Sequence, residues 1–175
     1  MKLFGPLARA VVLTGLSLAG VAAPSAAFAG PAELELLRSY EGEWRGRGQL
    51  IGAESESVVC RLNISKGNGD KVNYQGRCAV AGQTVAVNGT LAYIDARRRF
   101  EAAMTTNAGF TGLAIGQKRG GGIRFDLRER EKDEGGNDLQ IAAAIDLNKG
   151  QIVVNFDVTY VSTGDTIKAS VPFTK

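Results

Sequence analysis

The chain has 175 residues, 44% of them hydrophobic and 22% charged, which is typical of one globular domain with a short additional segment. Its 21 basic and 18 acidic residues give a net charge of +3, too small to indicate a nucleic-acid partner. The sequence contains no histidine, which excludes Ser-His-Asp and Cys-His catalysis and the H-E-x-x-H metal site.

Residues 1–29 have the pattern of a signal peptide. A basic start with Lys2 and Arg9 precedes the apolar run 10–23, and Ala27-Phe28-Ala29 matches an A-x-A cleavage site. Cleavage there would leave 19 of the 21 basic residues against 18 acidic ones. No cysteine follows the run to carry a lipid anchor, and no later segment approaches the roughly 18 apolar residues of a membrane span. We therefore expect a periplasmic or secreted bacterial protein with no integral membrane segment after cleavage.

Residues 30–41 are predicted to contain a short helix. Pro31 lies near its start, Glu33 favours the positive end of the helix dipole, and Gly42 is a stop signal. Its apolar face comprises Leu34, Leu37 and Tyr40. A face this small needs a larger partner, so we expect the helix to pack on the mouth of the domain that follows.

From residue 42 to 175 the hydrophobic pattern changes to a period of two, in short runs separated by turn-forming clusters. The connections are too short for parallel crossovers, so every neighbouring pair is predicted to be an antiparallel hairpin. The ten predicted strands are 42–50, 56–65, 71–80, 83–94, 98–105, 109–118, 122–131, 138–147, 151–161 and 166–174.

Several of these strands have one apolar and one polar face. In 138–147 and 151–161, for example, hydrophobic residues alternate strictly with polar ones. Ten such strands leave no unpaired edge if they close into an up-and-down antiparallel barrel, which is the fold class we predict. A two-sheet sandwich is the alternative architecture.

The hairpin over residues 56–80 brings the only two cysteines together. Its turn formers lie at residues 66–70, and a turn centred on 68–70 places Cys60 directly opposite Cys78. Cross-strand neighbours have Cβ atoms roughly 4.5–5.5 Å apart, near what a disulfide requires. We predict a disulfide contributing about 3 kcal/mol, with two reduced core thiols as the alternative.

The neighbouring hairpin predicts a row of like charges. A turn centred on Ala53 pairs Arg45 with Arg61, and the cysteine hairpin pairs Arg61 with Arg77. These three arginines should cross three strands on the solvent face, with Arg47 beside them. The row is either tolerated through screening and long, splayed side chains, or it binds an acidic protein or an envelope component such as a phosphorylated lipid head group.

The predicted inward face of the barrel is almost uncharged. Ten strands enclose more space than the eight that side chains just fill, so a cavity is expected unless large residues occupy it. The first four strands point glycines inward, which leaves either a pocket or room for aromatic rings from other strands. The candidate cavity residues are Trp44, Tyr74, Tyr93, Phe100, Met104, Phe125, Phe156 and Tyr160, with the tyrosines as polar groups.

A short helix followed by Gly42-x-Trp44 and a strand meander resembles the calycin superfamily of lipocalins, fatty-acid-binding proteins and nitrobindins. The resemblance implies that the tryptophan packs across the barrel end, and the segment 44–48 (W-x-G-x-G) is more similar to nitrobindins. Those proteins ligate haem through a histidine, which is absent here, so histidine-ligated haem is excluded. Small periplasmic metalloprotease inhibitors are a second resemblance.

No constellation indicates catalysis, a cofactor or a metal. The carboxylates of 129–134 are interleaved with basic residues at a hairpin end and are interpreted as a solvated turn. The glycine runs 120–122 and 135–136 are turns, since neither follows a phosphate-loop pattern. We expect a non-catalytic barrel that binds a small apolar or amphipathic ligand. The alternatives are a protein-binding barrel acting through its outer face, for example an inhibitor, and an isomerase or cyclase that uses a barrel tyrosine.

Overall fold

The computed structural model describes residues 30–80, 82–107, 109–133 and 135–175. The predicted signal peptide, residues 1–29, lies outside the described residues. The elements are helix α1 (Gly30–Arg38), strands β1 (Gly42–Ile51), β2 (Ser55–Lys66), β3 (Lys71–Val80), β4 (Gln83–Ile94), β5 (Arg99–Thr106), β6 (Thr111–Arg119), β7 (Gly122–Lys132), β8 (Asp138–Asn148), β9 (Gln151–Tyr160) and β10 (Thr166–Thr174), and the 3-10 turn η1 (Asp95–Arg97) between β4 and β5.

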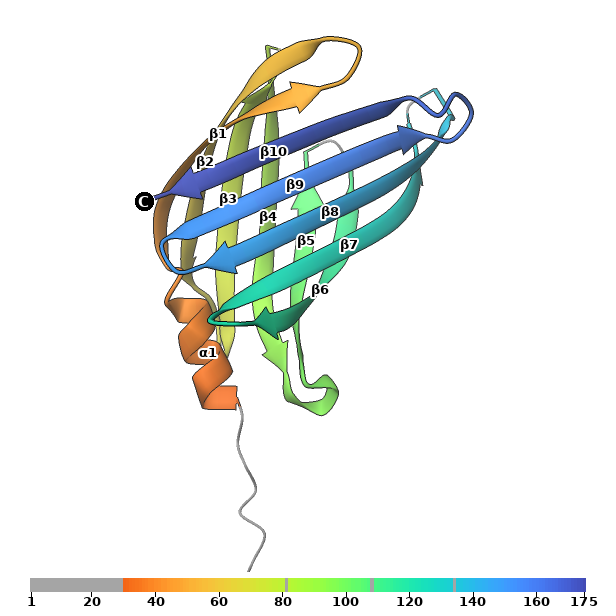
Figure 1. Cartoon of the computed structure of the whole chain (residues 1–175). Helices are drawn as coiled ribbons and strands as arrows, with labels where there is room; N and C mark the ends of the chain where they lie inside the picture. The colour runs from red at the N-terminus through yellow and green to blue at the C-terminus, as the bar shows by residue number, and fades with distance from the viewer. Residues whose placement is uncertain (1–29, 81, 108, 134) are drawn as a thin grey trace, which may run out of the picture.

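The ten strands form one closed antiparallel barrel (Figure 1). Each strand pairs with its neighbours in sequence, and β1 pairs with β10 to close the sheet. Glycines with positive φ turn several hairpins, for example Gly120 (56°) between β6 and β7 and Gly150 (78°) between β8 and β9. The predicted barrel is confirmed, with strand ends within two residues of those expected, and the sandwich alternative is wrong.

Helix α1 lies at one end of the barrel, below the ends of β3 and β4 in Figure 1. Its Leu37 is fully buried, and Leu36 packs beside it against the core in place of the expected Leu34. Just after the helix, the Tyr40 hydroxyl donates a hydrogen bond of 2.9 Å to the carbonyl oxygen of Leu147 in β8. The helix therefore caps the barrel through its C-terminal half.

Trp44 closes this end of the barrel, as its position on the first strand predicted. Only 1% of its surface is exposed, and its Nε1 donates a hydrogen bond of 2.9 Å to the carbonyl oxygen of Tyr40. The Lys175 Nζ lies 5.0 Å from the centroid of the indole ring and donates to the carbonyl oxygen of Glu41 at 2.9 Å. The indole is thus held by the helix, the first strand and the last residue together.

Aromatic rings occupy the space that inward glycines leave near this closed end. A Cβ atom placed on Gly116 would lie 2.6 Å from the ring of Phe125, and one on Gly46 would lie 2.8 Å from the ring of Phe173. The Phe125 ring also packs edge-on against Phe100, with centroids 6.4 Å apart. Of the two outcomes expected for the inward glycines, filling by rings is the one found in this half.

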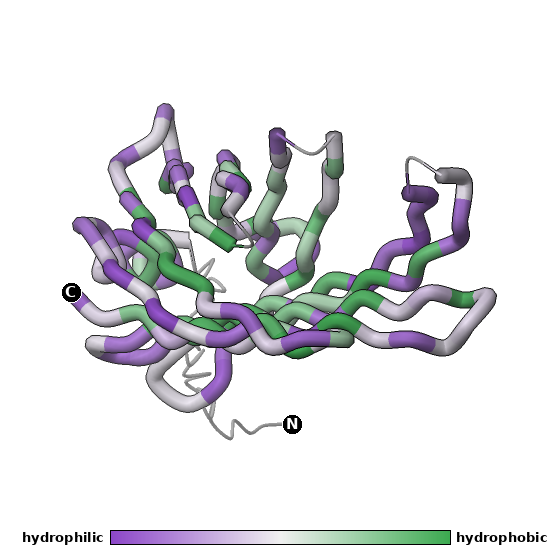
Figure 2. The backbone as a smooth tube through the Cα atoms, turned by 90° about the horizontal axis from the view of Figure 1, so that it is seen from above, coloured by the Kyte–Doolittle hydropathy of each residue, from purple (hydrophilic) through white to green (hydrophobic). Residues whose placement is uncertain are grey.

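Along the rest of the barrel wall, successive side chains of each strand alternate between the inward and the outward face. In Figure 2, which looks at the barrel from above, hydrophobic and hydrophilic residues alternate along the strands. The buried core residues all lie on the face that the register assigns to the interior or on the capping segment 37–40. The barrel thus has a packed closed half beside α1 and an opposite half bounded by the β1–β2, β3–β4 and β9–β10 hairpins.

Candidate functional site in the open half of the barrel

The half of the barrel away from α1, here called the open half, is not filled. Phe156 in β9 points inward, yet 36% of its surface is exposed, and inward-facing Val85 in β4 is 38% exposed. Phe156 lies opposite Ala143 in β8 and Ala169 in β10, so small side chains flank its ring on both sides. An inward aromatic ring with free surface indicates accessible apolar space inside the barrel.

Further hydrophobic residues line the open half. They are partly buried, in contrast to the fully buried residues beside Trp44, and they come from both sides of the barrel. This lining comprises Leu50, Val80, Val87, Met104, Phe110, Leu139 and Val158. This partly buried apolar lining is here called the cup.

The eight candidate cavity residues divide between the two halves. Trp44, Phe100 and Phe125 belong to the packed half, where at most 2% of each surface is exposed, and offer no free surface to a ligand. Tyr93 packs against Phe100, with ring centroids 5.0 Å apart. Three of the candidates face the open half, namely Met104, Phe156 and Tyr160.

Tyr74 lies between the halves and is used by the fold itself. Its hydroxyl donates a hydrogen bond of 3.1 Å to the carbonyl oxygen of Ala103, and burial raises the pKa of Tyr74. The hydroxyls of Tyr93 and Tyr160 make no hydrogen bond to any other described residue. Of these two, Tyr160, the last residue of β9, lies nearer the opening, where a ligand or water can reach it.

Two of the carboxylates interpreted as a solvated turn, Glu129 and Glu131, lie on the inward face of β7, where Glu129 is half-buried and Glu131 is exposed to solvent. The strand runs on to Lys132, so Glu129 lies opposite Ile141 and Glu131 opposite Leu139 on the inward face. The intervening basic residues Arg128 and Arg130 face outward. The alternation of acid and base at period two carried this signal in the sequence.

Glu56 in β2 is a third inward carboxylate at the open end. It lies opposite Leu50 and is half-buried. The opening therefore combines apolar walls with carboxylates from β2 and β7, which lie on different parts of the wall.

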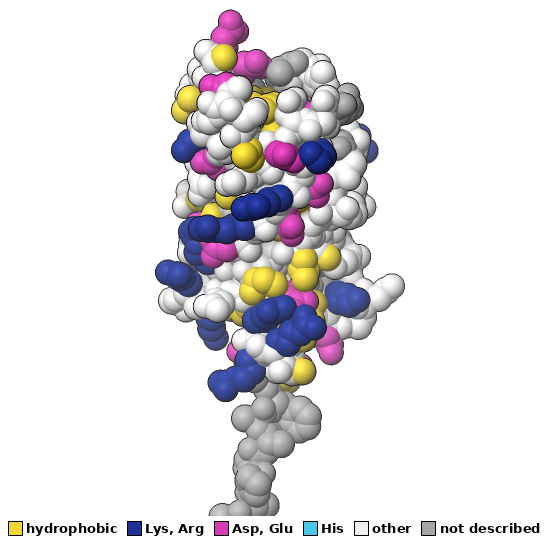
Figure 3. Space-filling model, turned by 90° about the vertical axis from the view of Figure 1, so that its right-hand side faces the viewer, with side chains coloured by type: hydrophobic (Ala, Val, Ile, Leu, Met, Phe, Trp, Pro, Cys, Tyr) yellow, Lys and Arg dark blue, Asp and Glu magenta, His cyan; other side chains and the backbone are white. Residues whose placement is uncertain are grey.

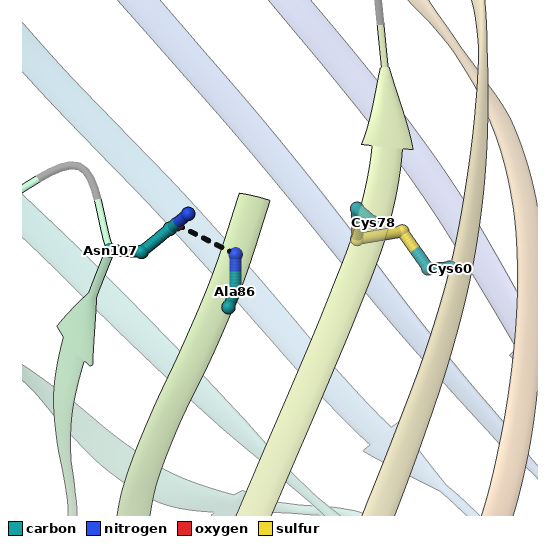
Figure 4. The surroundings of a disulfide bond; sticks show 4 residues. All are labelled: Cys60, Cys78, Ala86 and Asn107. Atoms are coloured by element: carbon teal, nitrogen blue, oxygen red, sulfur yellow. Dashed lines mark hydrogen bonds between the residues drawn. A yellow bond between two sulfur atoms is a disulfide. The ribbon is translucent and has the colours of Figure 1, made fainter. Parts of the chain in front are cut away.

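The disulfide stiffens the wall of the open half. Cys60 and Cys78 are joined as predicted, between β2 and β3, and Cys60 is 2% exposed (Figure 4). Nearby, Asn107 extends the β4–β5 pairing beyond the strand end. Its Oδ1 accepts a hydrogen bond of 2.8 Å from the Ala86 N–H, and its Nδ2 donates to the carbonyl oxygen of Thr84 at 2.9 Å. The disulfide thus links β2 to β3, and the two Asn107 bonds link β4 to the end of β5.

The outer face of β1, β2 and β3 carries the predicted arginine row. Arg45 pairs with Arg61, and Arg61 pairs with Arg77, so the three side chains share one face, and Arg47 follows two residues along β1. The row lies in a groove of about 360 Å³. The outward side chains lining this groove are Glu43, Arg45, Arg61, Asn63, Gln75, Arg77, Ala86 and Asn88.

A second outer groove, of about 590 Å³, crosses β7 to β10 and reaches β1. Most of its charges are paired: Arg124 contacts Asp146 at 2.8 Å, and Lys168 contacts Asp157 at 3.0 Å. Figure 3, which views the side that faces right in Figure 1, likewise shows lysine and arginine side chains intermixed with aspartate and glutamate. Mixed charge distinguishes these surfaces from the arginine row.

The described part of the chain has neither a metal-binding cluster nor a helix that could span a membrane. It holds no group of three or more histidine, cysteine, aspartate or glutamate side chains placed to bind a metal ion. Within the same residues, the single α-helix is too short to cross a bilayer.

The fold defines the chain as a closed ten-strand antiparallel β-barrel protein. No protein-family model matches the chain, and no curated protein matches it in sequence. Among solved structures, Rv2717c from M. tuberculosis is similar, with a TM-score of 0.65 and 13% identity over 81% of this chain and 96% of that one. At this identity the likeness shows the fold alone.

Two other solved barrels are more distant. The S-type phycobiliprotein lyase CPES from Guillardia theta has a TM-score of 0.48 and 8% identity over 79% of this chain and 89% of that one. The redesigned barrel mFAP0, bound to DFHBI, has a TM-score of 0.43 and 9% identity over 78% of this chain and 99% of that one.

Proposed function

We propose that this chain is an exported, non-catalytic barrel that binds a small apolar or amphipathic molecule in its open half. The observation that carries the proposal is the inward ring of Phe156, which is 36% exposed between two alanines. Full burial of an apolar side chain of this size contributes about 1.5–3 kcal/mol, so covering the exposed third of Phe156 would contribute roughly a third of that, about 0.5–1 kcal/mol. A ligand seated against Phe156 would gain that contribution without displacing any part of the packed half.

The opening favours a ligand with a polar end. Glu56 and Glu129 lie at the open end together with Tyr160, whereas Phe156 lies farther along β9 from that end. An amphipathic molecule can place its apolar part in the cup and leave its polar group in water at the carboxylates. The relation to nitrobindins and fatty-acid-binding proteins implied by Gly42-x-Trp44 belongs to the same proposal.

The proposal that the protein is non-catalytic and exported rests on the sequence and on the disulfide. The chain has no histidine, and its two cysteines are paired, so it offers neither a histidine base nor a cysteine nucleophile. A disulfide persists in oxidising compartments, which agrees with the expected signal peptide at residues 1–29.

Titration with N-phenyl-1-naphthylamine, a neutral fluorophore that brightens in apolar surroundings, tests this function. We expect saturable binding of one molecule per chain. Phe156→Lys should weaken it by about tenfold or more, because the ammonium group would lose hydration beside the ligand. The matched control is Thr159→Lys, which adds the same charge to the outer face of β9 and should bind normally.

Absence of saturable binding to the unmodified protein would contradict the proposal. Equal weakening by the two lysine variants would also contradict it, since that would place the fluorophore elsewhere. Circular dichroism of both variants establishes that each retains its strand content.

A further inference from the structure

The arginine row is a local concentration of charge on an otherwise balanced chain. After residue 29 the sequence carries 19 of its 21 basic residues and all 18 acidic ones. Three of those basic residues nevertheless lie directly opposite one another, because the β1–β2 register pairs Arg45 with Arg61 and the β2–β3 register pairs Arg61 with Arg77. The strand registers therefore create this local concentration of positive charge, because the chain after residue 29 is nearly neutral overall.

The row has an energetic cost that no ion pair between the described residues offsets. Like charges directly opposite one another destabilise a sheet by a few tenths of a kcal/mol or more. None of the ion pairs between described residues involves Arg45, Arg61 or Arg77, although other cations such as Arg124 and Lys168 do find carboxylates. Glu43 precedes Arg45 on the same face but makes no such contact.

Neutral hydrogen-bonding groups run alongside the arginines. One register step towards α1 lies a second row of side chains that crosses β2, β3 and β4. It consists of Asn63, Gln75 and Asn88. Each amide can donate hydrogen bonds without adding charge. One step the other way, the neighbours of Arg47 are Val59 and Ala79, which donate none. Donors thus converge on the groove from the arginine and amide rows only.

We propose that this groove binds a small molecule carrying a phosphate or sulfate group with at least two negative charges. Guanidinium groups match such oxyanions with two parallel hydrogen bonds each, and the amide row can donate to the remaining oxygens. Adjacent paired strands place Cα atoms about 4.5–5.5 Å apart, so three arginines span roughly 10 Å. That span suits a small ligand recessed in the groove of about 360 Å³ better than an extended anionic surface.

This site is separate from the cup of the proposed function. Arg61 points outward, whereas its strand neighbours Cys60 and Leu62 point into the barrel. The two sites are therefore on opposite sides of one sheet layer, and a change to the arginine head groups leaves the inward lining in place.

Isothermal titration calorimetry with inorganic pyrophosphate tests the site on the unmodified protein, Arg61→Gln and Arg130→Gln. Arg130 lies on the outer face of β7 opposite Gln140, so its replacement removes the same charge away from the groove. We expect pyrophosphate to bind the unmodified protein and Arg130→Gln alike, with affinity falling as salt rises. Arg61→Gln should lose about tenfold or more, because the central guanidinium is removed.

Several results would overturn the site. They are no pyrophosphate binding at low salt, equal loss in the two glutamine variants, or binding to anionic lipid vesicles without binding to pyrophosphate. Arg45→Gln serves as a second groove variant if Arg61→Gln does not fold. N-phenyl-1-naphthylamine binding should stay unchanged in Arg61→Gln, which separates failure of this site from failure of the cup.

Discussion

The hydroxyl of Tyr74 donates to the carbonyl oxygen of Ala103 across the space that Gly89 leaves by lacking a side chain. A Cβ atom on Gly89 would collide with both partners. The Tyr74 side chain therefore extends from β3 across Gly89 in β4 and is hydrogen-bonded to the backbone of β5. This contact marks the base of the open half on this side of the barrel, since the inward hydrophobic residues beyond it on β4 and β5 are only partly buried.

The Tyr74 contact predicts a loss of stability at high pH. Burial raises the pKa of Tyr74 above the value of about 10 of an unfolded chain, so the folded protein retains the phenolic proton longer. The resulting stability is fully present below pH of about 10 and is lost as pH rises from there towards the folded-state pKa. Urea unfolding across this range should show a decline that is shallower in Tyr74→Phe. Parallel declines in the two proteins would contradict the assignment.

Because aromatic rings fill the space beside the inward glycines, we predict that adding a single methyl group at such a glycine lowers the stability of the fold. Gly116→Ala would place a Cβ atom 2.6 Å from Phe125 and 2.9 Å from the Cβ atom of Phe100, so we expect a loss of about 1–3 kcal/mol in the free energy of unfolding. Gly121→Ala is the control, because nothing lies within 4 Å of a Cβ there. It should change stability by less than about 0.5 kcal/mol. Similar effects of the two substitutions would mean that the closed half is not packed as described.

Trp44 should be essential to the closed end. Trp44→Ala removes a ring that is 1% exposed and leaves a cavity under Tyr40, so we expect a loss of about 3–5 kcal/mol. Chemical denaturation measures the loss, and Trp44→Phe should lose less because it retains a ring. The intrinsic fluorescence of the native protein should be that of a buried indole. A spectrum of water-exposed indole would be incompatible with this placement.

Loss of the disulfide should weaken the wall of the open half. The two cysteines are separated by 18 residues, and removing a native disulfide from a small exported domain costs about 2–5 kcal/mol. Cys60→Ser should show this loss in denaturation experiments, with the unmodified protein in reductant as a comparison. Free thiols in denatured, unreduced material taken from the periplasm would refute both the pairing and the proposed compartment.

Local patterns were sufficient to predict the strands and two registers. Turn-forming residues lie at each hairpin tip, and a period of two assigns each side chain to a face, so Cys60 opposite Cys78 and Arg45 opposite Arg61 followed from short segments. The same rule, continued to the end of β7, would have assigned Glu129 to the inward face. Glu129 lies within the strand predicted over residues 122–131, but the charged run beside the glycines was interpreted as solvated.

The division of the interior was not predictable from these patterns. The ring of Phe173 reaches Gly46 because β10 pairs with β1, and this contact joins the two ends of the domain. Which ring enters which glycine gap depends on barrel closure and on rotamers, which no local pattern encodes. The alanines at 143 and 169 likewise became informative only when the register placed them on both sides of Phe156.

Methyl-resolved nuclear magnetic resonance during titration with N-phenyl-1-naphthylamine tests most directly whether the open half binds a ligand. The account predicts that the methyl signals of Val85, Met104 and Val158 shift progressively and saturate together. The signals of Ile123, Leu147 and Ile152 in the packed half should remain in place. Shifts confined to outward methyl groups such as those of Val59 and Leu113, or no saturable shift at any inward methyl, would contradict the account.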